Sequence, residues 1–299
     1  MAQIVECVPN FSEGRRKDVV EAIASAVREV QGVRLLDVEM DSSHNRAVLT
    51  FIGEPGAVQE AAFRSAAKAV ELIDLNVHRG EHPRIGAADV IPFVPISNIS
   101  MEGCVRIAHE LGERLWKELA VPVYFYAEAA LKPERRLLPK IRKGEFEALK
   151  EEMGVKPERR PDVGEPRIHP TAGATVVGAR GPLIAYNVNL RTDDLDLAKR
   201  IAKRIRASSG GFPGVQAKGF RLEDKDMVQV SMNLLNFRVT AIPTVFEAIR
   251  EEAEAAGVSI DSSEVVGLVP LDALLDCAES YLKLEEFSRD QILERRLWE

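Results

Sequence analysis

The segment His78-Arg79-Gly80-Glu81-His82-Pro83-Arg84 concentrates side chains that could do chemistry. Its letters match the H-x-x-E-H pattern of an inverted zinc-peptidase motif. That chemistry needs both imidazoles and the carboxylate on one face of a helix. Gly80 weakens a helix, and Pro83 disfavours helical geometry at the residue before it, His82. The sequence therefore argues against a zinc site, and we predict no metal.

The same segment fits a rigid loop better. Pro83 holds His82 extended, while Gly80 and Gly86 let the backbone turn tightly. A histidine on such a loop suits proton transfer, because the imidazole can both accept and donate a proton near neutral pH. The spacing alone leaves a second interpretation open, in which His82 only braces the loop.

The composition limits the classes of protein to consider. With 299 residues, of which 45% are hydrophobic, the chain can bury one large core or two medium ones. The net charge of −7 argues against a general nucleic-acid binder. Cys7, Cys104 and Cys277 are odd in number and far apart, which fits free thiols in a reducing compartment. Because we find no signal peptide and no long apolar run, we expect a cytoplasmic protein without a membrane span.

Elements that must position the loop can be read on both sides of it. The apolar spacing predicts a strand, a helix, two strands, a helix and a strand, which is a ferredoxin-like βαββαβ order. The expected ranges are 3–9, 15–31, 33–38, 47–52, 55–74 and 90–96. Prolines in the last of these predict an edge strand or a strand end. A helix at 100–119 and a strand at 121–126 extend the sheet.

The second half of the chain repeats this pattern without repeating its residues. Residues 132–162 are rich in charge and proline and predict an irregular or helical surface segment, with a basic run at 135–143 that we interpret as solvated. Strand-like sequence returns at 174–177, and a second βαββαβ order begins at 183. Its expected ranges are 183–188, 193–206, 215–222, 227–236, 242–256 and 263–268, with a further helix from 271. We therefore predict an α+β protein with two domains, 1–180 and 181–299.

Long strings of the sequence resemble glutamate formimidoyltransferase. They include VECVPNFSEG at 5–14, HRGEHPRIGAADVIPF at 78–93 and IAYNVNL at 184–190, with shorter matches at 45–46, 50–53 and 173–175. This resemblance covers nearly the whole chain. It implies two ferredoxin-like subdomains with a substrate groove between them, a homodimer, and the transferase part alone, without the cyclodeaminase region that follows in animal members.

The resemblance also implies a reaction. The family moves the formimino group of N-formimino-L-glutamate onto N5 of tetrahydrofolate and releases L-glutamate, a step in histidine breakdown and one-carbon metabolism. Tetrahydrofolate is then a co-substrate, and the expected partners are small molecules, without nucleic acid or membrane. Two alternatives stay open, an enzyme that processes 5-formyltetrahydrofolate and one that uses formiminoglycine. A non-catalytic folate-binding protein is a third.

Site residues follow from the same resemblance. His82 matches the family's catalytic histidine. The family's folate-binding loop matches Val163, Gly164, Glu165, Pro166, Arg167, Ile168, His169, Pro170, Thr171 and Ala172. Arg167 and His169 make this loop more basic than in animal members. A plain connection between the domains is the alternative for this stretch.

The residues that support the histidine are less sharply defined. Where animal members carry an aspartate, this sequence has Glu39, with Asp41 close by, and either carboxylate could serve. Asn10 is a further candidate for substrate contact, and Arg79 and Arg84 can bind carboxylates through paired hydrogen bonds. His44 and its neighbours are expected at a strand turn, where a purely turn-forming role competes with a functional one.

Overall fold

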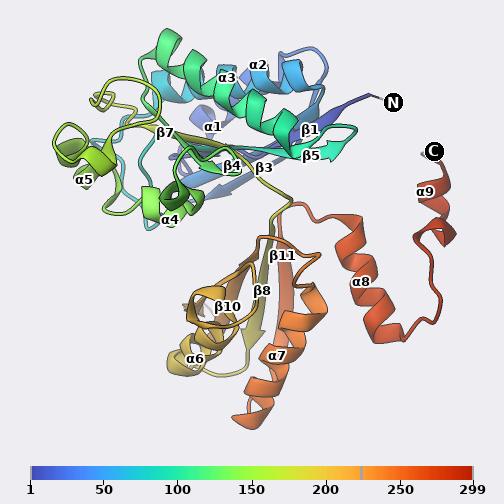
Figure 1. Cartoon of the computed structure of the whole chain (residues 1–299). Coiled ribbons are helices and arrows are strands. Elements are labelled where there is room, and N and C mark those ends of the chain that lie inside the picture. Colours follow the sequence, from blue (N-terminus) through green and yellow to red (C-terminus); the bar gives the residue numbers. More distant parts are fainter. Residues whose placement is uncertain (1, 223–224, 298–299) are drawn as a thin grey trace. The chain divides into compact units, whose positions relative to one another are not determined.

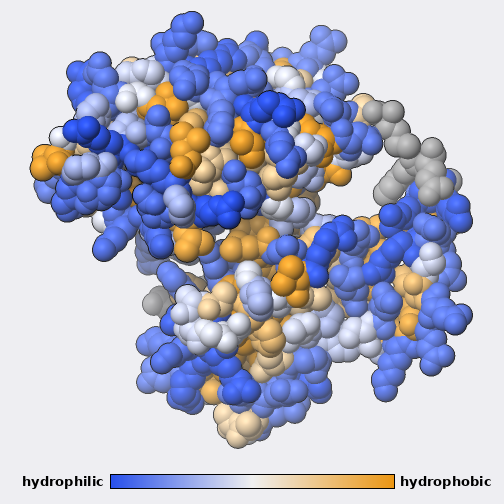
Figure 2. All heavy atoms as spheres, viewed as in Figure 1, coloured by the Kyte–Doolittle hydropathy of each residue, from blue (hydrophilic) through white to orange (hydrophobic). Residues whose placement is uncertain are grey.

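A computed structural model describes residues 2–222 and 225–297, shown in Figure 1. The described residues divide into two compact units, and the division lies between Gly181 and Pro182. Each unit has its own hydrophobic core. Hydrophilic side chains cover much of the face shown in Figure 2, as expected for a chain with 29% charged residues.

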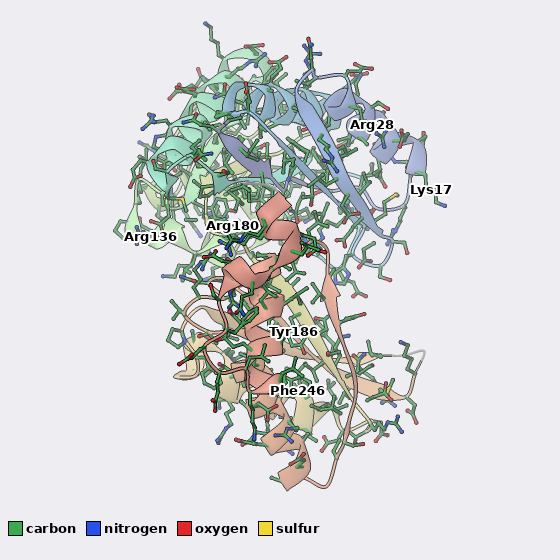
Figure 3. All side chains as sticks on the ribbon, turned by 90° about the vertical axis from the view of Figure 1, so that its right-hand side faces the viewer. Lys17, Arg28, Arg136, Arg180, Tyr186 and Phe246 are labelled. Atoms are coloured by element: carbon green, nitrogen blue, oxygen red, sulfur yellow. The ribbon has the colours of Figure 1, made fainter. Side chains whose placement is uncertain are left out.

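The first unit begins with the expected ferredoxin-like order. Its elements are β1 (Ile4–Cys7), β2 (Asn10–Phe11), α1 (Lys17–Arg28), β3 (Val33–Asp41), β4 (Arg46–Gly53), α2 (Pro55–Leu72) and β5 (Ala88–Ser97). Strands β1 and β2 act as one interrupted strand, because both pair with β4 on one side and with β5 on the other. Helix α1, whose first and last residues are labelled in Figure 3, buries a stripe of valine and isoleucine against the sheet.

Two further strands extend this sheet. After α3 (Met101–Leu119) come β6 (Val123–Ala127) and, later in the chain, β7 (Thr175–Ala179), which inserts in parallel between β5 and β6. Within the described residues the sheet has seven strands. Alternate residues of its strands point to α1, α2 and α3 and form the larger core, so the loops and the opposite face remain for other roles.

The prolines of β5 predicted an edge strand or a strand end, and the first alternative is wrong. Strand β5 lies inside the sheet, between β1/β2 and β7. Pro92 falls opposite the break between β1 and β2, and Pro95 lies where the register with β1 shifts. Each missing N–H is thus placed where the ladder is already irregular, which removes the usual penalty for proline in a central strand.

The charged segment after β6 forms short helices. They are η1 (Pro133–Arg136), α4 (Leu138–Ile141), α5 (Glu145–Glu152) and η2 (Pro157–Arg159). Ile141, Leu149 and Met153 are buried in a small core with Tyr124 of β6 and Val176 of β7. This segment therefore covers part of the sheet face that α1, α2 and α3 leave open.

The second unit has the predicted ferredoxin-like order in full. Its elements are β8 (Ile184–Leu190), α6 (Leu195–Ile205), η3 (Ala207–Ser209), β9 (Val215–Leu222), β10 (Met227–Leu234), α7 (Ile242–Ala255) and β11 (Ile260–Val266). The sheet of the described residues has the antiparallel order β11-β8-β10-β9, which is the ferredoxin-like order. The predicted α+β fold with two βαββαβ units is confirmed.

The described chain ends in helical pieces. They are α8 (Leu271–Leu282), which begins where the sequence predicts it, η4 (Arg289–Gln291) and α9 (Leu293–Leu297). Phe246 of α7 meets Tyr281 of α8 edge to face, with ring centroids 6.3 Å apart. Among the residues described, no helix combines the length and apolar character needed to cross a membrane.

Candidate active site

The loop between α2 and β5 carries the His78–Arg84 segment, and it contains no helix at these residues. The single helical face that the zinc-peptidase motif requires is therefore absent here. Both ring nitrogens of His78 are engaged in other contacts. Its Nδ1 accepts from Nε of Arg84 at 3.2 Å, and its Nε2 lies 2.9 Å from the carbonyl of Asn45. Since a guanidinium only donates, His78 is a neutral imidazole that donates through Nε2.

Close packing holds the loop against the turn between β3 and β4. A Cβ on Gly80 would lie 2.3 Å from the carbonyl oxygen of His44, so only glycine fits this approach. The side chain of Asn45 donates to the carbonyl of Arg79 at 2.9 Å. Gly80 is needed for this close contact rather than for the tight turning that the sequence suggested, because its φ lies outside the left-handed range.

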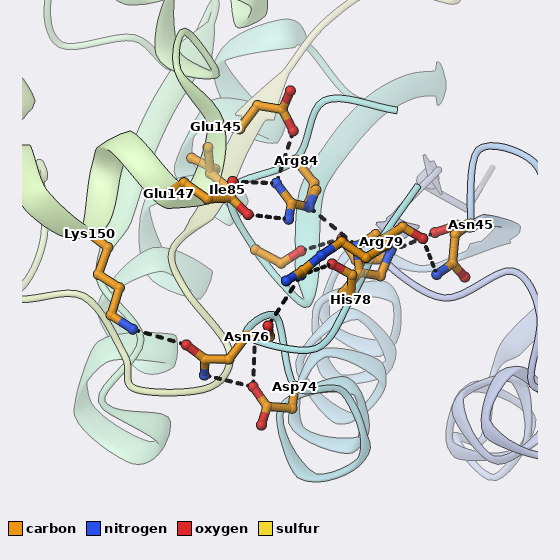
Figure 4. A network of polar contacts seen from close by, with 12 residues as sticks. Asn45, Asp74, Asn76, His78, Arg79, Arg84, Ile85, Glu145, Glu147 and Lys150 are labelled. Carbon is orange, nitrogen blue, oxygen red and sulfur yellow. Dashed lines mark hydrogen bonds and ion pairs between the residues drawn. The ribbon is translucent and has the colours of Figure 1, made fainter. Parts of the chain in front are cut away.

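Arg84 braces the loop from the other side (Figure 4). Its guanidinium is buried and donates to Glu147 through two hydrogen bonds of 2.7 Å and to Glu145 at 2.9 Å, both near the start of α5. Arg79, in contrast, is exposed and donates to the backbone carbonyls of Asn76 and His78. In this structure both arginines bind protein groups, so the geometry favours loop-bracing roles over the substrate contacts that the sequence suggested.

The end of the loop is fixed by Asp89 at the start of β5. This buried carboxylate accepts from the backbone N–H groups of Ile85 at 2.7 Å and Gly86 at 3.2 Å. It also forms an ion pair with Arg142, which follows α4. Asp89 thus ties the loop to the segment after β6 and holds the guanidinium of Arg142 near the site.

His82 lies in a small concavity formed by residues 10–12, 44–46, 78, 82, 84 and 89. Its Nε2 is 3.2 Å from Nη1 of Arg46, which begins β4. The same Nη1 donates to the side-chain oxygen of Asn10 at 3.2 Å. Because the guanidinium can only donate, Nε2 of His82 accepts, and the imidazole is neutral with its proton on Nδ1. Asn10 therefore lines the concavity and also holds Arg46 beside His82.

The surroundings of His82 strongly favour this neutral form. Burial, followed by the positive charges of Arg142 and Arg46, lowers the pKa of His82 from 6.5 to about 2. His44 adds to this effect, while Asp41 opposes it. With this low pKa His82 is neutral but only a weak base in the free protein, and an anionic ligand that neutralised the arginines would raise its pKa and strengthen it as a base.

Asp41 is bonded to a second histidine of the site. Its carboxylate accepts from the backbone N–H of His44 at 2.9 Å and lies 2.6 Å from Nδ1 of the same ring. Although burial alone would raise it, these hydrogen bonds lower the pKa of Asp41. Glu39 lies on the same face of β3, and its negative charge favours the charged form of Arg46. Both carboxylates thus lie near the site, and Asp41 is hydrogen-bonded to the ring of His44.

The stretch 163–172, for which the sequence predicts folate binding, is hydrogen-bonded to both ends of the segment that carries His82. The carbonyl of Thr171 accepts from the N–H of Leu75 at 2.8 Å, and that of Ala172 accepts from the N–H of Ala87 at 2.8 Å. Within the loop, Nδ1 of His169 accepts from the N–H of Ala172 at 2.9 Å. Residues 165–167 are exposed. The stretch is therefore a loop whose C-terminal end is fixed by hydrogen bonds, while residues 165–167 are exposed to solvent.

Arg46 and Arg142 are site residues that sequence reasoning missed. Nε of Arg46 is buried without a hydrogen-bond partner in the part of the chain that the structure describes. Arg46 could have been noticed in the sequence, because it lies in the short match at 45–46 to the formimidoyltransferase family and immediately precedes the strand predicted at 47–52. The interpretation of the basic run as solvated is wrong for Arg142 and for Arg135, which is buried in an ion pair with Asp162. It holds for Arg136, which is exposed and labelled in Figure 3.

A half-buried neutral imidazole that accepts from a guanidinium, on a braced loop of an α+β fold, is an arrangement typical of enzyme sites. Comparison with known proteins gives the family. The N-terminal subdomain of the formiminotransferase domain matches residues 4–180, and the formiminotransferase domain matches residues 185–295.

Similar proteins agree with these matches. A glutamate formimidoyltransferase of Streptococcus pyogenes serotype M1 is 48% identical, over 99% of both chains. One from Thermoplasma acidophilum is 50% identical, over 98% of this chain and 97% of the relative. A formimidoyltransferase-cyclodeaminase of Gallus gallus is 52% identical over 96% of this chain, which spans 54% of that relative. The chain belongs to the formiminotransferase family.

Proposed function

We propose that this protein is a glutamate formimidoyltransferase, which moves the formimino group of N-formimino-L-glutamate to N5 of tetrahydrofolate and releases L-glutamate. Its relatives of matching length carry this name. The structural observation that supports it best is the neutral imidazole of His82, which lies 3.2 Å from the guanidinium of Arg46 in a concavity. A neutral base beside a cation suits a reaction that removes a proton while an anionic substrate is bound.

The chemistry explains why a base is needed. N5 of the folate attacks the formimino carbon, and the resulting tetrahedral adduct carries a positive charge on N5 until that nitrogen loses its proton. In our proposal His82 accepts this proton through Nε2, after the substrate displaces Arg46 from its contact with the ring. A positioned base of this kind contributes about 10²–10⁴-fold to the rate. Holding two substrates in one orientation contributes a further, comparable factor.

Arg46 is the group that we propose for binding a carboxylate of the amino-acid donor. Its Nε is buried and has no hydrogen-bond partner among the described residues, and Asn10 fixes its Nη1. Burial and then repulsion by Arg142 lower the pKa of Arg46, while the charges of Asp41, Asp89 and Glu39 oppose this. A carboxylate would relieve that repulsion and pair with the buried nitrogen.

Residues 163–172 are our proposal for the loop that contacts the folate. Gly164 has a φ of +100° and packs against Trp116, which fixes the start of the loop, while residues 165–167 leave backbone and side-chain groups exposed. Because the end of the loop is hydrogen-bonded beside residues 75 and 87, a folate bound there would lie near the segment that carries His82. We also propose that the protein is a cytoplasmic homodimer. Light scattering of the purified protein tests the dimer.

One assay tests the function. The protein is incubated with tetrahydrofolate and N-formimino-L-glutamate, and both 5-formiminotetrahydrofolate and L-glutamate are quantified. We expect equal amounts of the two products, and no product from folded protein would refute the proposal. Parallel reactions with formiminoglycine and with 5-formyltetrahydrofolate measure the two alternatives. His82→Ala should reduce turnover by about 10²–10⁴-fold while tetrahydrofolate still binds.

A further inference from the structure

A second histidine, His44, lies in the same concavity as His82. Their ring centroids are 6.3 Å apart with an interplanar angle of 68°. His44 belongs to the turn between β3 and β4, and its ring is held at Nδ1 by the carboxylate of Asp41 at 2.6 Å. Because Nδ1 is occupied by the hydrogen bond to Asp41, Nε2 is the ring nitrogen that could exchange a proton with a bound substrate.

Hydrogen bonds hold the turn that carries His44. The backbone N–H of His44 is bonded to Asp41, and Asn45 adopts a left-handed conformation with φ of 49°. The side chain of Asn45 accepts from the N–H of Gly14 and donates to the carbonyl of Arg79. The side chain of His44 is 41% exposed, so its ring is held by hydrogen bonding and is still open to solvent.

Charged and titratable groups lie near His44 on the elements around it. Asp41, the last residue of β3, is bonded to its ring. The ring of neutral His82 lies 6.3 Å away between centroids, and Arg46 of β4 contacts that second ring. Arg15, which follows β2, donates to the carbonyl of Ser42 in the same turn. Asp41 is the anion bonded to the ring, and it compensates the positive charge of a protonated His44. His82, in contrast, has the guanidinium of Arg46 against its Nε2, which opposes a positive charge there.

These two environments suit opposite tasks. The transfer needs a base for the proton of N5 and an acid for the departing glutamate nitrogen, because an amine leaves poorly unless it is protonated. A carboxylate bonded to one ring and a guanidinium against the other suit the two imidazoles to different roles in proton transfer. We propose that His44 is a second catalytic residue, the general acid that protonates the leaving glutamate amine, with Asp41 as its positioning residue. This inference rests on the proposed function and adds a named role to it.

The proton and electron changes balance in this scheme. N5 bonds to the carbon of the cationic formimino group, and the electrons of the C=N bond return to nitrogen. His82 then takes the proton of N5, and His44 gives one to the glutamate nitrogen. The bond from carbon to that nitrogen breaks with its electron pair leaving on the amine, while the N5 lone pair helps form the new amidinium. One proton has moved from His44 to His82, and exchange with solvent resets both rings.

Three variants test the role of His44 in the full-length protein. His44→Gln should lower kcat by about 10²-fold or more while the KM values for both substrates change little. Asp41→Asn should lower kcat by about 10-fold or more, since the ring keeps its place but loses the compensating charge. Ser43→Ala, a change in the same turn, is the control and should leave kcat unchanged. If His44→Gln keeps kcat within about threefold of the wild-type value, the proposal is overturned.

A second donor separates acid catalysis from a structural role. A formamidine made from 4-aminobenzoate releases an arylamine, which needs far less protonation than glutamate in order to leave. With this donor, His44→Gln should lower kcat by less than about tenfold relative to wild type. His82→Ala should lower kcat as much as it does with formiminoglutamate. Equal losses with both donors would show that His44 only maintains the structure. If the wild type transfers nothing from formiminoglutamate, the proposed function itself fails, which is a distinct result.

Discussion

Replacing Gly80 with alanine should damage catalysis more than it damages the fold. The added Cβ would lie 2.3 Å from the carbonyl oxygen of His44, where ordinary contact begins at 3.4 Å, so the loop must move by about 1 Å from the turn. Both neighbouring groups are backbone or Cβ atoms of that turn and cannot rotate away. A displacement of about 1 Å between catalytic groups costs roughly 10²-fold in rate. Overpacking of this kind costs about 1–3 kcal/mol of stability.

The measurements are kcat/KM for formimino transfer and the free energy of unfolding in urea. Gly56→Ala is the matched control, because a Cβ at that position in α2 meets nothing within 4 Å. It should leave activity unchanged and stabilise the protein by about 0.5–1 kcal/mol, as alanine does in a helix. Wild-type activity in a folded Gly80→Ala protein would show that the contact between loop and turn does not position His82.

Three further outcomes are expected. Arg46→Met should raise the KM for the formimino donor by about tenfold or more, because a charged hydrogen bond of about 1.5–3 kcal/mol is lost. A change confined to the KM for tetrahydrofolate would contradict the proposal that Arg46 binds the donor's carboxylate. The hydrogen bonds from Arg84 lower the pKa of Glu147 from 4.5 to about 2. The stability from this pair is therefore present above pH 4.5 and lost as the pH falls towards 2, so the gap in unfolding free energy between wild type and Glu147→Gln should narrow in acid. Gly164→Ala should destabilise the protein by about 1–3 kcal/mol, because its Cβ would lie 2.7 Å from the ring of Trp116, and unchanged urea midpoints would argue against a fixed loop start.

The sequence was sufficient for the elements of the fold. Apolar spacing located strands and helices in both halves, because side-chain periodicity reflects which face of an element is buried. Gly80 and Pro83 excluded a helix at the histidine loop through local backbone preferences alone. Such effects act between neighbours in the chain, so they can be read without a structure.

Strand order depended on tertiary structure. The prolines of β5 suggested an edge, but the break between β1 and β2 accommodates Pro92 inside the sheet. Likewise, β7 returns to pair between β5 and β6, although the charged segment separates it from β6 in sequence. Neither pairing follows from local pattern, because a strand shows which face it buries but not which neighbour it meets.

The properties of the site were decided in the same way. The sequence singled out His82 and offered Arg79 and Arg84 for binding carboxylates. In the structure Arg84 binds Glu147, and it is Arg46 that lies against the imidazole. Arg142, from a run that looked solvated, also acts on His82. Burial and through-space charge set the protonation of His82, and both depend on distances that only the folded chain defines. The sequence by itself therefore determined which residue could carry a proton, and the tertiary structure decided that its ring is neutral.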